Sequence, residues 1–173
     1  MTSQQMPIVY ITNELAQQTA ALLESFALRR PSEGVVYWFG MESDSAAIVT
    51  TLIVPDANTV DGSIRTSAEA NAAAVGVIVG TPLVYLGQAH SHPGSHVVHS
   101  RVDDQETFAR FDGAISLVVP WFGKYGLHLE ECGVHRHLGG RFREIRDVDA
   151  HARILPGLAD LRSATGERVT NER

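Results

Sequence analysis

The chain has 173 residues, of which 44% are hydrophobic and 20% charged, as expected for one globular domain. Its net charge is −6, so a nucleic-acid binder, which is normally basic, is not the first class to consider. The one cysteine, Cys132, excludes an internal disulfide and a cysteine-based zinc finger. We find no signal-peptide pattern and no apolar run near the about 20 residues that span a bilayer, and we therefore expect a cytoplasmic protein without a membrane partner.

Predicted helices and strands alternate along the chain. In chain order we expect a helix over 13–30, strands over 35–39 and 46–54, a helix over 66–79, a strand over 83–90, a short helix over 100–111, and strands over 115–119, 126–131 and 141–145. Thr12 or Asn13 can cap the first helix, and Pro31 ends it. From Pro156 onwards we expect a short helix and a polar tail. This order predicts a three-layer α/β domain on a mixed sheet.

Histidines are concentrated at the end of the predicted strand 83–90. The chain has eight, and four of them fall between His90 and His99. Residues two apart on a strand point to the same face, so the imidazoles of His90 and His92 can reach one ion. Asp103, in the first turn of the next predicted helix, can supply an oxygen ligand. Three such ligands leave one position of a tetrahedral zinc open, which is typical of a catalytic site.

Two further residues complete the candidate site, each with a simpler alternative. Ser100 and Asp103 also fit an S-x-x-D capping box that needs no metal, although such a cap would hold Asp103 in place. A hydrolase needs a base, and Glu33, at the start of the strand 35–39, is our candidate. The alternative for Glu33 is a solvated side chain in a turn.

The remaining histidines and the cysteine carry weaker signals. His96 and His99 are expected either to line the cleft or to face water. His135 and His137 alternate like a second metal pair, but no third ligand lies at a suitable spacing, so we favour a structural role. Cys132 falls in an apolar pattern and is interpreted as a packed thiol.

The pattern formed by these residues resembles the signature of the JAMM (JAB, MPN+) metalloproteases. It consists of His90-x-His92, Ser100 and Asp103 with an upstream Glu33. The spacing from Glu33 to Gly40 also matches the family, whereas Val36 stands where the family often has a second glycine. The resemblance covers approximately residues 8–146, leaving 147–173 as a C-terminal extension. It implies a three-layer α-β-α, cytidine-deaminase-like fold with a mixed central sheet.

The resemblance also implies a role for each site residue. His90, His92 and Asp103 would bind one Zn²⁺ per chain, and Glu33 would deprotonate the water bound to it. Ser100 would stabilise the tetrahedral oxyanion by hydrogen bonding. No covalent intermediate is needed, so Cys132 is not required as a nucleophile.

The family implies a class of substrate as well. We expect cleavage of the isopeptide or peptide bond after the C-terminal glycine of a ubiquitin-like protein, so this modifier and its conjugates are the expected partners. The compact chain is similar to bacterial stand-alone deconjugases of the BilD and CBASS-associated types, found in antiphage operons. Alternatives are a peptidase that matures a sulfur-carrier protein, and a non-catalytic MPN-type scaffold, against which the intact ligand set argues. A RadC-like role linked to DNA is disfavoured by the acidic charge.

Overall fold

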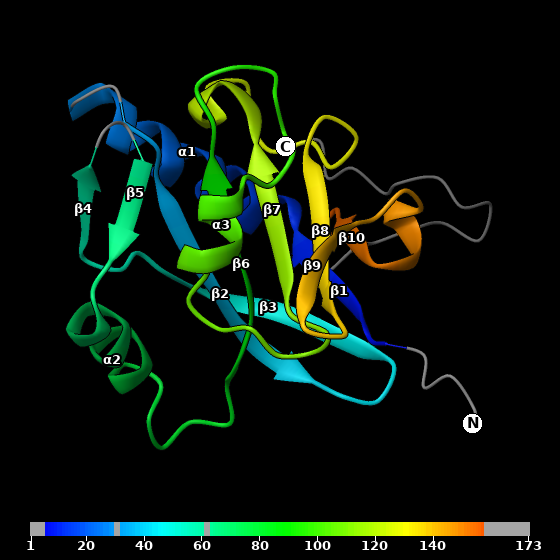
Figure 1. Cartoon of the computed structure of the whole chain (residues 1–173). Helices are drawn as coiled ribbons and strands as arrows, with labels where there is room; N and C mark the ends of the chain where they lie inside the picture. Colours follow the sequence, from blue (N-terminus) through cyan, green and yellow to red (C-terminus); the bar gives the residue numbers. More distant parts are fainter. Residues whose placement is uncertain (1–5, 30–31, 61–62, 158–173) are drawn as a thin grey trace, which may run out of the picture.

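A computed structural model of the chain describes residues 6–29, 32–60 and 63–157 (Figure 1). Eight strands form one sheet in the order β10-β1-β3-β2-β6-β7-β8-β9. They are β1 (Ile8–Thr12), β2 (Val35–Glu42), β3 (Ala46–Ile53), β6 (Val84–Ser91), β7 (Ile115–Val119), β8 (Gly133–Leu138), β9 (Arg141–Glu144) and β10 (Ala152–Leu155). Parallel and antiparallel neighbours both occur, so the predicted α/β class with a mixed sheet is confirmed.

The remaining elements surround this sheet. β4 (Ala57–Val60) and β5 (Ser63–Thr66) form a separate antiparallel pair. The helices are α1 (Asn13–Arg29), α2 (Ala68–Gly76) and α3 (Arg101–Glu106), with 3₁₀ turns η1 (Pro120–Gly123) and η2 (Val148–Ala150). Within the described ranges, no helix has the length and apolarity needed to cross a membrane.

The three helices predicted before residue 112 are present, and two of them are shorter than expected. α1 begins at Asn13, where the Thr12 hydroxyl accepts a hydrogen bond from the Leu15 N–H at 3.3 Å. α2 begins after Ser67, whose side chain caps it, and not at residue 66. α3 ends at Glu106 instead of reaching residue 111, because Thr107 already has an extended backbone.

One predicted strand is wrong. Residues 126–128 are irregular and 129–131 form a turn, and the strand follows them as β8, which pairs with β7 and β9. Buried Leu127 and Leu129 alternate with exposed His128, which imitates the two-residue period of a strand. The positive φ of Gly126, 89°, instead turns the chain there.

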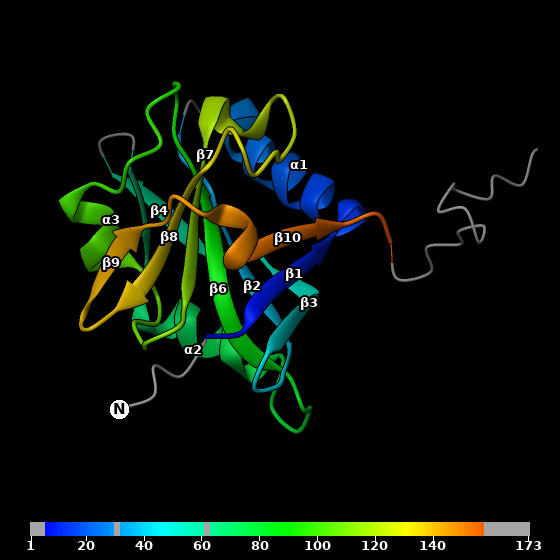
Figure 2. The same ribbon diagram turned by 90° about the vertical axis from the view of Figure 1, so that its right-hand side faces the viewer.

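The sequence did not indicate two strands of the sheet, β1 and β10. It also did not indicate β4 and β5, which form the separate pair. β10 lies in the segment 147–173, expected as an extension, and pairs in parallel with β1 (Figure 2). The helix predicted from Pro156 falls beyond residue 157 and so outside the described residues.

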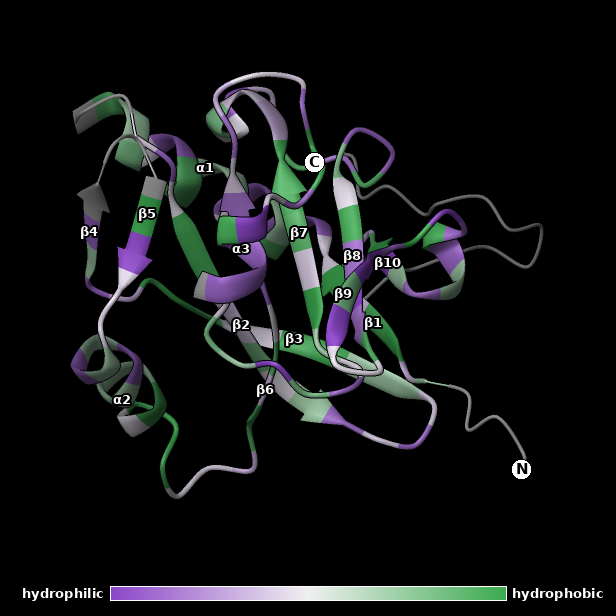
Figure 3. Ribbon diagram, in the orientation of Figure 1, coloured by the Kyte–Doolittle hydropathy of each residue, from purple (hydrophilic) through white to green (hydrophobic). Residues whose placement is uncertain are grey.

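β2 lies in the middle of the sheet, and its residues 35–40 are buried. Figure 3 colours the ribbon by hydropathy and shows an apolar start of this strand. On one face, Val36 and Trp38 belong to a core cluster that includes Leu23 of α1. On the other face, Tyr37 belongs to a second cluster with Ala74 of α2. β6 lies next to β2, so the candidate ligands are at the end of one of the two central strands of the sheet.

Candidate metal centre

The end of β6 positions both candidate histidines. His90 lies between β2 and β7, opposite Val35 on one side and Val118 on the other. His92 follows the strand, yet its backbone stays bound: its N–H donates to the Val119 carbonyl at 2.9 Å. Its own carbonyl accepts the Phe122 N–H at 2.9 Å. Both imidazoles are buried, so the backbone and the packing around them hold them in place.

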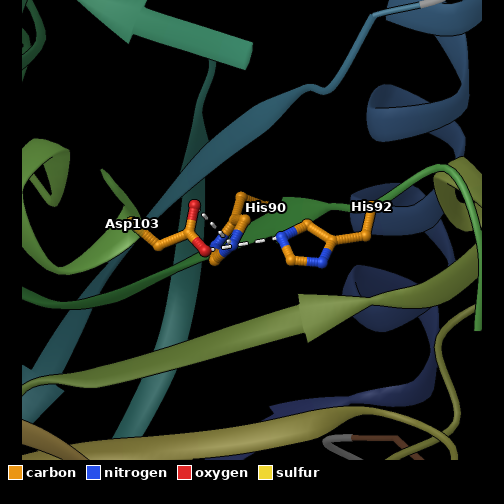
Figure 4. A group of neighbouring side chains, drawn as sticks. All are labelled: His90, His92 and Asp103. Carbon is orange, nitrogen blue, oxygen red and sulfur yellow. Dashed lines mark ion pairs between the residues drawn. The ribbon is translucent and has the colours of Figure 1, made fainter. Parts of the chain in front are cut away.

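Asp103 reaches the same point from the first turn of α3, as the close-up shows (Figure 4). Its Oδ1 lies 3.6 Å from His90 Nε2, and its Oδ2 lies 3.5 Å from His92 Nε2. Potential ligand atoms of the three residues all lie within 4.8 Å of one another. The structure therefore brings the three predicted ligands together.

The capping box predicted as an alternative is also present. The Ser100 hydroxyl oxygen accepts the N–H groups of Val102 and Asp103, each at 3.2 Å. In return, the Ser100 N–H donates to Asp103 Oδ2 at 2.6 Å. The cap and the candidate metal site share the Asp103 carboxylate, so one does not exclude the other.

The nitrogen atoms of the two histidines fit a metal ion. Among the residues that the structure describes, neither Nδ1 nor Nε2 of His90 has a hydrogen-bond partner, although both are buried, and an unpaired buried polar atom is costly. His92 Nδ1 lies 2.8 Å from the His96 carbonyl oxygen. A carbonyl can only accept, so Nδ1 carries the proton and the lone pair of Nε2 faces Asp103. Two such nitrogens and a carboxylate suit a transition-metal ion.

The charges of the site are strongly coupled. Burial alone would raise the pKa of Asp103, but the neighbouring imidazoles of His90 and His92 and the hydrogen bond from the Ser100 N–H hold it well below its usual range. Burial lowers the pKa of His90. For His92, burial acts in the same direction, but Asp103 and the His96 carbonyl outweigh it and the pKa is raised. The carboxylate is therefore kept anionic, as a metal ligand must be.

Glu33 lies beside this group, immediately before β2. The Gly34 N–H donates to the Ser91 hydroxyl at 2.9 Å, and the Ser91 N–H donates to the Gly34 carbonyl at 3.0 Å. This antiparallel pairing places Glu33 alongside His92. Burial raises the pKa of Glu33, the charge of His92 lowers it and that of Asp103 raises it. Glu33 is half-buried, in contrast to the alternative of a solvated turn residue, and it lies outside the group of ligand atoms within 4.8 Å.

Sequence reasoning did not identify the role of His99. We expected it to line the cleft or face water, but its side chain is 5% exposed. Its Nδ1 lies 2.9 Å from Asp104 Oδ1 and its Nε2 lies 3.0 Å from Ser116 Oγ. The ring stacks on His135, with centroids 4.2 Å apart. Only its place beside Ser100 could have drawn attention to it.

The other histidines have separate partners. His135 Nδ1 lies 3.2 Å from the Gly133 carbonyl oxygen, and His137 Nδ1 lies 3.0 Å from Asp112 Oδ1. Each ring is thus oriented by its own hydrogen bond, which agrees with the structural role favoured for this pair. His96 is exposed and acts on the site through its backbone carbonyl.

Comparison with known proteins gives one relative by sequence and several by structure. No family model matches the sequence. The probable metalloprotease y4jG of Sinorhizobium fredii (strain NBRC 101917 / NGR234) is 32% identical over 119 residues. The match spans 60% of this chain and 66% of the relative, slightly less than two thirds of the latter's length.

The solved structure of protein DSY2949 from Desulfitobacterium hafniense has a similar fold, with a TM-score of 0.64 at 16% identity over 87% of this chain and 95% of that chain. AF2198, a JAB1/MPN domain protein from Archaeoglobus fulgidus, matches with a TM-score of 0.49 at 15% identity over 79% of this chain and 94% of that chain. The chain carries the residue pattern of the JAMM/MPN signature, its His90, His92 and Asp103 meet at the end of β6, and it is similar to a probable metalloprotease.

Proposed function

We propose that the protein is a zinc-dependent isopeptidase or peptidase that cleaves after the C-terminal glycine of a ubiquitin-like protein. The observation that carries this proposal is that the two histidines have ring nitrogens free to bind an ion and that Asp103 is charged. The buried nitrogens of His90 have no hydrogen-bond partner within the described part of the chain, His92 turns its Nε2 towards Asp103, and Asp103 is kept anionic. Zinc held by three nitrogen and oxygen ligands retains an open fourth position, which a hydrolase needs.

The chemistry of the proposed reaction is divided among five residues. His90, His92 and Asp103 would hold the ion. Zn²⁺ bound there supplies Lewis acidity, which polarises a carbonyl group and makes water acidic enough to serve as a nucleophile near neutral pH. Glu33 takes up the proton of the attacking water and passes it to the leaving amine. Its raised pKa suits this task, because a general base works best when its pKa approaches the working pH.

Ser100 is proposed to stabilise the oxyanion of the reaction. Its hydroxyl oxygen accepts the two N–H groups of the cap, which leaves its proton available for donation. A hydrogen bond aimed at a developing negative charge is worth more in the transition state than in the ground state.

The strand β5 is proposed to bind the substrate tail. Ile64 and Thr66 of β5 line a hollow of about 30 Å³ together with His90 and Asp103. Among the described residues β5 pairs with β4 alone, so its other edge can add an extended peptide as a further strand. A space this small leaves no room for a bulky side chain, which favours glycine next to the scissile bond.

We also propose the three-layer, cytidine-deaminase-like description of the fold. Its support is the pair of core clusters on opposite faces of β2, one including α1 residues and the other Ala74 of α2.

A cleavage assay tests the proposed function. Purified protein is incubated with ubiquitin-like proteins fused through their C-terminal glycine to a reporter, and zinc is measured on the same sample. A sulfur-carrier protein with the same fusion is included, so that the assay also separates the two pathways. We expect cleavage that a chelator abolishes, with about one zinc per chain.

Two variants separate binding of the ion from proton transfer. His92→Ala should lose both zinc and activity. Glu33→Gln should keep zinc and lose about 10²-fold to 10⁴-fold in rate, because it removes the base. His128→Gln, at an exposed position, is the control and should behave like the wild type. Equal cleavage by Glu33→Gln and the wild type, or no zinc after purification under metal-retaining conditions, would show that the proposal is wrong.

A further inference from the structure

α3 carries a ligand of the proposed metal centre but has little support of its own. It comprises six residues, Arg101–Glu106, and Arg101 and Val102 at its start are exposed. A helix this short is not stable in isolation. The position of Asp103 must therefore come from contacts that hold the two ends of α3 against the sheet.

The C-terminal end of α3 is attached through Phe108. The ring of Phe108 stacks on Tyr37 of β2, with centroids 4.9 Å apart and an interplanar angle of 19°. Its N–H donates to Gln88 Oε1 of β6 at 3.4 Å. These contacts fix where α3 ends, but they lie one turn beyond Asp103 and leave its first turn unrestrained.

The N-terminal end of α3 is attached through His99. The Asp104 carboxylate can only accept, so His99 Nδ1 carries the proton and donates to it at 2.9 Å. Nε2 then accepts the hydroxyl proton of Ser116, a fully buried residue of β7, at 3.0 Å. The His99 backbone N–H donates to His135 Nε2 of β8 at 3.4 Å. One residue thus connects the helix to two strands, through its side chain to β7 and through its backbone to β8.

This connection acts directly on the ligand. Asp103 and Asp104 are consecutive, so their side chains point about 100° apart around the helix axis. Holding Asp104 against His99 fixes the rotation of the first turn, and that rotation directs Asp103 towards His90 and His92. The His99 ring also lies edge-on to His90, with centroids 5.3 Å apart, and so restrains a ring whose nitrogens have no hydrogen bond.

We propose that His99 is a positioning residue of the metal centre: together with Asp104 and Ser116 it fixes the rotation of α3 and thereby sets the metal affinity of the site. The inference rests on the metal site of the proposed function, and it concerns binding of the ion rather than cleavage. Partners that orient ligands in this way typically change metal affinity by about 10-fold to 100-fold when they are removed.

Metal titration tests the proposal without any substrate. Metal-free protein is titrated with Zn²⁺ against a competing chelator, and with Co²⁺, whose visible absorption reports the ligand geometry. His99→Phe keeps a ring to stack on His135 but can neither donate nor accept. We expect about 10-fold to 100-fold weaker zinc binding and weaker tetrahedral Co²⁺ bands for His99→Phe and for Asp104→Ala. Asp104→Asn retains an oxygen that can accept the Nδ1 proton, so it should stay within about threefold of the wild type.

The matched control removes an equivalent pair elsewhere. His137 and Asp112 form the same kind of contact at 3.0 Å, and His137→Phe should leave zinc affinity unchanged. Wild-type affinity in both His99→Phe and Asp104→Ala would overturn the proposal, as would an equal loss in His137→Phe. The Asp104 side chain is 44% exposed, so its variants provide the test even if His99→Phe does not fold. A wild-type protein that binds zinc in a His99-dependent way but cleaves no fusion would support this inference and overturn only the proposed cleavage.

Discussion

Two buried imidazoles should make the metal-free protein sensitive to mild acid. Burial lowers the pKa of both His99 and His135 from 6.5 to about 4. The unfolded chain therefore binds protons more readily than the folded one. The contribution of the two neutral imidazoles to the free energy of unfolding is complete above about pH 6.5 and is lost as the pH falls towards about 4. The difference in pKa corresponds to about 3 kcal/mol for each ring, of which about 2 kcal/mol is lost by about pH 5. The raised pKa of His92 acts in the opposite direction and reduces the sum.

Urea unfolding of chelator-treated protein measures this effect. The fluorescence of Trp38, which is 1% exposed, reports loss of the core. We expect the free energy of unfolding of the wild type to fall by about 2 kcal/mol or more between about pH 7.5 and about pH 5. His99→Phe should lose about 2 kcal/mol less, because its ring does not titrate, whereas His128→Gln should follow the wild type. A wild-type free energy that is the same at both pH values, or a His99→Phe variant with the full pH dependence, would refute the reasoning.

Three further predictions concern the surroundings of the site. Arg136 is 1% exposed and donates to the carbonyls of Gly113 at 2.9 Å and Pro7 at 2.8 Å. Arg136→Met should therefore lower the free energy of unfolding by about 3–5 kcal/mol in a urea titration. A loss below about 1 kcal/mol would contradict this prediction. A Cβ on Gly133 would lie 1.7 Å from the Val97 carbonyl oxygen, so Gly133→Ala should displace the loop between the ligands and weaken zinc binding in a competition titration. A Cβ on Gly94 would meet no described atom within 4 Å, so Gly94→Ala should leave zinc binding unchanged. Burial raises the pKa of Cys132 to about 12, so its alkylation near pH 8 should be at least about 100-fold slower in the native protein than in urea. Rapid alkylation of the native protein would contradict this and show an accessible thiolate.

Local patterns account for what the sequence predicted well. The spacing of His90 and His92 predicts a shared face because side chains alternate along any strand. The start of α1 follows from a cap within three residues of the chain, at Thr12. Such features depend on neighbours in sequence, which a single chain displays directly.

Features that depend on distant partners could not be predicted. β10 and β1 are short parallel strands from opposite ends of the chain, and each is defined by its pairing rather than by its composition. The segment 126–131 has the burial alternation of a strand, and only the tertiary structure reveals that it is irregular and ends in a turn. Two partners of His99, Ser116 and His135, are 17 and 36 residues away, and although Asp104 lies only five residues away, the sequence does not indicate that these residues meet.

Asp103 combines a local role with a distant one, and its substitution by glutamate separates the two. Oδ2 accepts the Ser100 N–H at 2.6 Å to close the cap, while Oδ1 faces His90 Nε2 at 3.6 Å. Glutamate is a preferred residue at this position of a capping box, so Asp103→Glu can keep the cap and with it the stability of α3. The additional methylene displaces the carboxylate relative to His90 and His92, and metal ligands tolerate displacements of only about 0.2 Å. We therefore expect Asp103→Glu to unfold within about 0.5 kcal/mol of the metal-free wild type and yet to bind zinc at least about 10-fold more weakly in a competition titration. Unchanged zinc affinity in this variant would mean that the carboxylate serves the helix alone.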